Sequence, residues 1–116
     1  MKKFVFELDG KEIAMRLSSG DVIELEKKKN ASIMEIISKV SFENVVTLIR
    51  YMRKSSDGSF STSDAQDLID ELIDEGYDLV SIYSKIILPT CQVSGLISEK
   101  DLNAFQEAIT DQHTQG

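Results

Sequence analysis

The change of hydrophobic period near residue 18 is the feature that most constrains the fold of this chain. Before it, apolar and polar side chains alternate on both sides of Asp9-Gly10, a dipeptide typical of a two-residue hairpin turn. This turn predicts a register that places Phe6 opposite Ile13. The expected apolar face of the hairpin consists of Phe4, Phe6, Ile13, Met15 and Leu17. Because a lone hairpin is marginally stable in water, this face must pack on helices or on a partner.

After residue 18 the apolar residues recur at helical spacing. Ser18 is the expected N-cap of the first helix, and Asn30 is expected to end it. The inward-facing residues expected on the first four helices are Val22, Ile23, Leu25, Ile33, Ile36, Ile37, Val40, Phe42, Val45, Val46, Ile49, Met52, Leu68, Ile69, Leu72 and Ile73. Residues 55–64 read as a loop with a turn at Gly58, and Ser63 with Gln66 reads as the capping box of the fourth helix.

Two further helices are expected, one at residues 77–88 that stops at Pro89 and one at 98–109 that is capped by Ser98. These elements predict an α+β fold, an N-terminal β-hairpin packed on a bundle of five to six short α-helices. We expect one globular domain at residues 1–110, with the hairpin at 3–18 and the helical part at 19–110. Residues 111–116 read as a polar tail.

Composition and charge exclude several classes of function. The formal net charge of −7 argues against a nucleic-acid partner, since phosphate binding needs a concentrated cationic face. The basic run Lys27-Lys28-Lys29 is expected at a helix C-terminus, where cations complement the helix dipole. No apolar run approaches the roughly 20 residues that span a bilayer, so no membrane partner is expected. The first residues do not read as a signal peptide, which predicts a cytoplasmic protein.

The sequence offers little support for an enzyme. Its only histidine, His113, lies in the polar tail, where a nucleophile and its base are hard to hold together. Its only cysteine, Cys91, lies in an apolar context typical of a buried thiol. The carboxylates Asp67, Asp70, Glu71 and Asp74 share one helix face but lack a calcium-binding loop, so they read as a solvated surface. We therefore expect no catalytic residues, no cofactor and no metal.

The order of elements resembles the tail assembly chaperones of long-tailed phages and prophages of Gram-positive bacteria. The resemblance covers roughly residues 3–88 and includes the later segment DAQDLIDELIDEGYDLVSIYSKII. Its N-terminal positions are Met15, Arg16, Leu17, Ser18, Ser19, Ile23, Glu24, Leu25 and Glu26. The resemblance implies a protein that binds and solubilises the tape measure protein, helps recruit tail tube subunits and self-associates along its client. A programmed ribosomal frameshift appends a second domain in many such phages.

An apolar surface for such a client should lie where the short helices fail to bury their side chains. The candidate residues are Val45, Leu48, Tyr51, Met52, Tyr83, Ile86 and Ile87. Leu48 and Tyr51 fall off the centre of their helix's apolar stripe and are the most informative pair, although each can also pack within the monomer. The alternative is a small helical regulatory or protein-interaction domain with no role in phage assembly. Its only support is the basic patch of Arg50, Arg53 and Lys54, together with Lys27 to Lys29.

Overall fold

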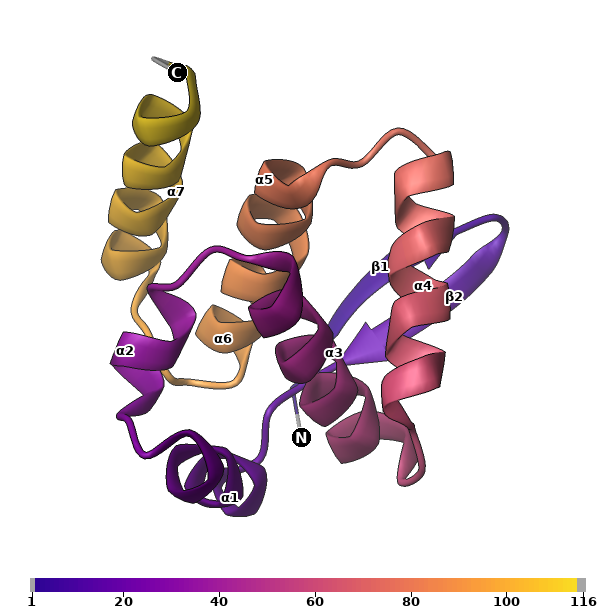
Figure 1. Ribbon diagram of the computed structural model, residues 1–116, viewed down its shortest axis with the longest axis horizontal. Coiled ribbons are helices and arrows are strands. Elements are labelled where there is room, and N and C mark those ends of the chain that lie inside the picture. Colours follow the sequence, from indigo (N-terminus) through magenta and orange to yellow (C-terminus); the bar gives the residue numbers. More distant parts are fainter. Residues whose placement is uncertain (1, 115–116) are drawn as a thin grey trace.

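The computed structural model describes residues 2–114, and the side chains of residues 2–110. Its elements, in chain order, are β1 (Phe4–Leu8), β2 (Lys11–Met15), α1 (Ser19–Lys29), α2 (Ile33–Ile37), α3 (Phe42–Asp57), α4 (Thr62–Asp74), α5 (Leu79–Ile82), the π-helix η1 (Tyr83–Ile87), α6 (Leu88–Val93) and α7 (Glu99–Thr114). The hairpin lies on one side of the helices, with α3 near the centre (Figure 1). The predicted α+β fold is confirmed.

The hairpin adopts the register predicted from its turn. Phe6 lies opposite Ile13, and β1 and β2 are antiparallel. Asp9 and Gly10 have φ angles of 51° and 77°, as a turn with two left-handed residues requires. Met15 is fully buried, while Phe6 and Ile13 are half-buried against the core. The apolar face of the hairpin therefore packs on the helices of its own chain.

Helix α3 is the centre of the core. Its residues Leu48, Ile49 and Met52 are fully buried, and the helix packs against α1, α4, β2 and η1. Hydrogen bonds attach β2 directly to α3: Arg16 N–H donates to the Met52 carbonyl at 3.2 Å, and Arg53 Nη1 donates to the Ala14 carbonyl at 2.6 Å. The helix thus carries apolar residues on several sides because it has neighbours on several sides.

The expected loop at residues 55–64 is shorter than the sequence predicts. Helix α3 continues to Asp57, Gly58 ends it with a φ of 82°, and α4 begins at Thr62. The capping box is formed by Ser61 and Asp64, so the predicted pair of Ser63 and Gln66 is wrong. Serine recurs at every second position before α4, and the N-cap is the one followed three residues later by a carboxylate.

Several predicted helix ends are confirmed. Ser18 caps α1 by accepting the Asp21 N–H, and Asn30 ends the helix in the left-handed region. Helix α2 is shorter than its apolar pattern suggests, because the side-chain amide of Asn44 takes the carbonyls of Ile36 and Lys39 at 2.6 and 2.8 Å. The chain therefore turns from α2 into α3 within a few residues.

Three side chains expected to face inward are exposed. Ile23, Phe42 and Ile73 are 53%, 49% and 43% exposed, respectively. Ile23 and Ile73 each follow a buried residue, Val22 and Leu72, and lie at the edge of their helix's apolar stripe. Phe42 is the first residue of α3. Hydrophobic periodicity identifies the apolar stripe of a helix, but it does not show how far around the helix the neighbouring elements cover that stripe.

Pro89 does not end a helix, contrary to prediction. The chain runs from α5 through η1 into α6, and Pro89 is the second residue of α6. The π-turn bonds the Leu88 N–H to the Tyr83 carbonyl, and proline has no N–H to give to the next carbonyl. The Gln106 side-chain amide of α7 donates to this carbonyl, that of Ser84, at 2.6 Å. Helix α7 thereby satisfies the backbone group that Pro89 leaves free.

Helix α7 extends further than expected. Ser98 and Asp101 exchange the predicted capping hydrogen bonds, at 3.1 and 3.3 Å, but the helix continues to Thr114. Part of the expected polar tail is therefore helical. The side chain of His113 lies outside the described residues.

The hairpin is part of the core, which predicts a large effect of Met15→Ala. Removing a fully buried methionine side chain should lower the free energy of unfolding by about 2–5 kcal/mol. Ile23→Ala, at an exposed position, is the control and should change it by less than about 0.5 kcal/mol. Urea unfolding followed by circular dichroism measures both. An equally small effect of the two substitutions would mean that the hairpin and the helices do not share a core.

Candidate functional site

The residues predicted to contact a partner lie in the protein interior. Each of the seven is at most 2% exposed: Val45, Leu48, Tyr51, Met52, Tyr83, Ile86 and Ile87. The prediction that these side chains form an accessible surface is therefore wrong. Leu48 and Tyr51 are buried although they lie off the stripe's centre, because α3 has neighbours on more than one side and these neighbours cover them.

The two tyrosines of this set use their hydroxyl groups inside the fold. Tyr83 donates to the main-chain carbonyl of Ile37 and thereby ties η1 to the end of α2. Burial raises the pKa of the Tyr83 hydroxyl well above its ordinary value, and it is not a group that ionises near neutral pH. Tyr51 donates to Glu24 on α1 at 3.3 Å. Both residues therefore hold helices together.

A polar seam joins α1 to α3. Lys54 lies 3.5 Å from a carboxylate oxygen of Asp21 and 3.5 Å from one of Glu24. Burial alone would raise the pKa of the Asp21 carboxyl. Hydrogen bonds from Ser55 and Ser18, together with the ammonium group beside it, outweigh that effect and hold this pKa below its ordinary value.

The basic patch that supported the alternative function is largely engaged within the chain. Arg53 donates to a β2 carbonyl, lies 3.5 Å from Asp57 and lies over the Phe60 ring. Lys54 belongs to the polar seam. Arg50 lies over the Tyr51 ring, and its Nε is buried without a hydrogen-bond partner among the described residues. These contacts leave no concentrated cationic face on α3.

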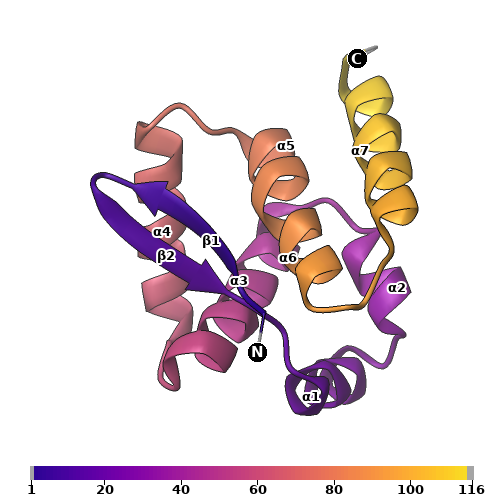
Figure 2. The same ribbon diagram turned by 180° about the vertical axis from the view of Figure 1, so that it is seen from behind.

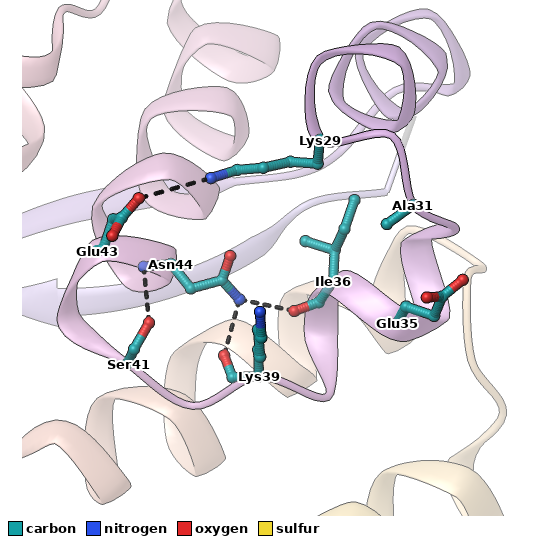
Figure 3. A pocket seen from close by; sticks show the side chains of 8 residues that line it. All are labelled: Lys29, Ala31, Glu35, Ile36, Lys39, Ser41, Glu43 and Asn44. Carbon is teal, nitrogen blue, oxygen red and sulfur yellow. Dashed lines mark hydrogen bonds and ion pairs between the residues drawn. The ribbon is translucent and has the colours of Figure 1, made fainter.

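A groove lies where α1, α2 and α3 meet (Figure 3). It encloses about 480 Å³ and is lined by Lys29, Ala31, Glu35, Ile36, Lys39, Ser41, Glu43 and Asn44. Lys29 reaches from the end of α1 toward Glu43 on α3, with 4.0 Å between the charged atoms. Asn44 is held in place by its bonds to the end of α2, so the wall of the groove is fixed by the same contacts that turn the chain.

Two exposed apolar side chains neighbour this groove in the sequence. Met34 is 40% exposed and precedes the lining residue Glu35. Phe42 is 49% exposed and lies between the lining residues Ser41 and Glu43. Neither of them lines the groove, and we define the eight lining residues as the α2–α3 groove. Its mixture of apolar groups and charges of both signs suits an amphipathic protein segment.

Sequence reasoning did not identify this groove, because its walls come from three helices whose arrangement is not local. One signal was available. Ser32 and Ser41 are two N-caps only nine positions apart, which indicates a very short helix with a sharp turn after it. The exposure of Phe42 has no such signal, since a phenylalanine at an apolar-stripe position normally points inward.

The side chains considered above for catalysis or metal binding include Cys91 and the carboxylates on α4. Cys91 is fully buried, and burial raises the pKa of its thiol to about 12. Among the described residues, no three histidine, cysteine or acidic side chains are grouped so as to hold a metal ion. The carboxylates on α4, at Asp67, Asp70, Glu71 and Asp74, are exposed. None of the described helices combines the length and apolar character needed to cross a membrane.

The polar seam predicts a pH-dependent loss of stability. Folding lowers the pKa of the Asp21 carboxyl below its ordinary value of 3.8, so its contribution to stability is complete above about pH 5. This contribution is lost as the pH falls through 3.8 and then through the lower pKa of the folded state. Asp21→Asn should lower the free energy of unfolding by about 1–2 kcal/mol at pH 7. The difference from the unsubstituted protein should shrink below about pH 4. Chemical unfolding at several pH values measures this, with the exposed Asp74→Asn as control. A pH-independent difference would contradict the role given to Asp21.

Cys91 should be unreactive in the folded protein. A thiol with a pKa of about 12 is almost entirely protonated at pH 8, and its burial blocks access. An aromatic disulfide reagent should label less than about a tenth of the protein in the time that labels it fully in denaturant. Rapid stoichiometric labelling of the native protein would show an accessible, activated thiol and would reopen the question of catalysis.

Comparisons with known proteins give no relative for this chain. No family model matches it, and neither a curated protein nor a solved structure matches it either.

Proposed function

We propose that this protein is a phage tail assembly chaperone that binds and solubilises the tape measure protein and helps recruit tail tube subunits. It acts in the host cytoplasm by binding and without catalysis. The resemblance of residues 3–88 to that family supports the proposal. The observation that carries its physical side is the α2–α3 groove, whose lining combines the apolar Ala31 and Ile36 with charges of both signs.

The chemistry of the groove fits a long amphipathic helix. Such a client presents an apolar stripe flanked by charged residues, and a groove accepts it through apolar anchors spaced along the helix. Lys29 and Glu35 supply both signs of charge at the rim. The net charge of −7 keeps the loaded complex soluble.

Co-expression with the tape measure protein of the same genome, followed by size exclusion, tests the proposal. We expect a soluble complex of high mass. Glu35→Lys and Lys39→Glu should each lower the recovered complex by about tenfold, because each reverses a charge in the lining of the groove. Both residues are already exposed, so both variants should fold, which circular dichroism checks.

Ile23→Asp is the matched control. Ile23 is 53% exposed, and it lies about 120° around α1 from Lys29, away from the groove. It should leave complex recovery unchanged. Equal loss with all three variants would mean that the groove is not the binding site. A tape measure protein that stays insoluble beside a soluble partner would favour the alternative, a small helical regulatory or interaction domain with no role in phage assembly.

A further inference from the structure

Arg50 is the cation on α3 that has no polar partner among the described residues. The helix carries two other cations, and both are engaged. Arg53 donates to the Ala14 carbonyl at 2.6 Å and lies 3.5 Å from Asp57, and Lys54 belongs to the polar seam. Arg50, in contrast, makes neither a hydrogen bond nor an ion pair within the described part of the chain.

The missing partner has a cost in the free chain. The Arg50 side chain lies over the Tyr51 ring, with 5.5 Å between Cζ and the ring centroid, and its Nε is buried. A buried donor gives up its hydrogen bond to water, and without an acceptor nothing replaces that bond. The residue is still partly exposed, and Nη1 and Nη2 are not buried with Nε. The accessible end of the guanidinium therefore has donors to offer to an acceptor from outside the chain.

This accessible end lies on the outer side of α3. Arg50 is about 160° around the helix from the fully buried Met52. On one flank Tyr51 binds Glu24 of α1, and on the other flank Arg53 binds β2. The view from behind shows the hairpin lying across one side of α3 and α4 (Figure 2). Arg50 thus points away from the core, between the contacts that α3 makes with α1 and with β2.

We infer that Arg50 is a binding site for an acidic side chain, an aspartate or a glutamate, of a partner protein. The carboxylate binds end-on, with one oxygen accepting from Nη1 and the other from Nη2. The site lies outside the α2–α3 groove and does not depend on the proposed function. If that function holds, the tape measure protein supplies the acidic side chain.

The charges around Arg50 favour a carboxylate over a phosphate group. Glu43 lies two turns earlier on the same side of α3. Asp21 and Glu24 accompany Lys54, which follows Arg50 by one turn. A phosphate group carries up to two negative charges, so these carboxylates repel it more strongly than a group with one charge. The planar guanidinium also matches the planar carboxylate in shape.

The strength of a single ion pair favours a side chain of a protein over a free anion. One pair at a protein surface contributes little affinity by itself. Within a larger interface, an arginine that gains its missing acceptor contributes far more, and arginine is enriched among the residues that dominate binding. Val46 and Thr47, one turn before Arg50, are also partly exposed and can contact the apolar part of a partner side chain.

A pair of variants on α3 shows whether Arg50 serves the free chain. Arg50→Met keeps an unbranched stem over Tyr51 and removes the unpartnered donor, so the urea midpoint should stay unchanged or rise. Arg53→Met is the matched control. It removes the bonds to Ala14 and Asp57, so its midpoint should fall. An equal fall with both variants would show that Arg50 has a structural partner and would overturn the inference.

Titration of the purified chain tests the ligand directly, with nuclear magnetic resonance of the arginine Nε–H groups and the backbone amides. The probe is a blocked tetraglutamate peptide at low salt, and blocked tetraglutamine is its neutral match. We expect the tetraglutamate to shift the Arg50 signal with a Kd of about 1–10 mM and the tetraglutamine to leave it in place. Arg50→Gln should weaken the response of the amides of residues 46–54 by at least about tenfold. Lys100→Gln, the same change of charge at an exposed position on α7, should change it by less than about twofold.

Three results would overturn the inference: no shift with tetraglutamate, equal weakening by Arg50→Gln and Lys100→Gln, or an equally strong response to inorganic phosphate. The last would mean a general anion site in place of a site for protein carboxylates. None of these measurements uses the tape measure protein. Binding of tetraglutamate at Arg50 beside a tape measure protein that stays insoluble would support this inference and contradict the proposed function.

Discussion

Burial of α3 on several sides is the constraint on which the rest of the structure depends. Ile49 and Tyr51 are both buried, although about 160° separates them around the helix. Water must therefore be excluded from more than one side, and β2, α4, η1 and α1 supply the cover. The polar groups of α3 follow the same requirement, since Asn44 binds the end of α2 and Tyr51 binds α1.

This closed core decides where the protein can interact. The aliphatic residues that looked suited to a client are occupied in holding the helices together, so a partner must use what remains outside. What remains outside includes the α2–α3 groove, whose lining carries charges of both signs.

Sequence reasoning succeeded where the determining interactions are local. The Asp9-Gly10 turn specifies its own register, and Ser18 caps a helix through a contact three residues away. It failed where distant segments decide. Leu48 lies off the apolar stripe, and only the neighbours of α3 bury it. Pro89 stays within a helix because the distant Gln106 satisfies the carbonyl that it leaves free. The groove could not be predicted for the same reason.

Hydrogen–deuterium exchange of the protein, free and in complex with the tape measure protein, tests the central claim that binding uses the surface and leaves the core closed. The account predicts slower exchange at residues 33–43, which span α2, the connection after it and the first two residues of α3. It predicts no change at residues 45–52, whose amides are already protected inside the core. Faster exchange at residues 45–52 in the complex, without protection at 33–43, would show that the client opens the core and would contradict the account.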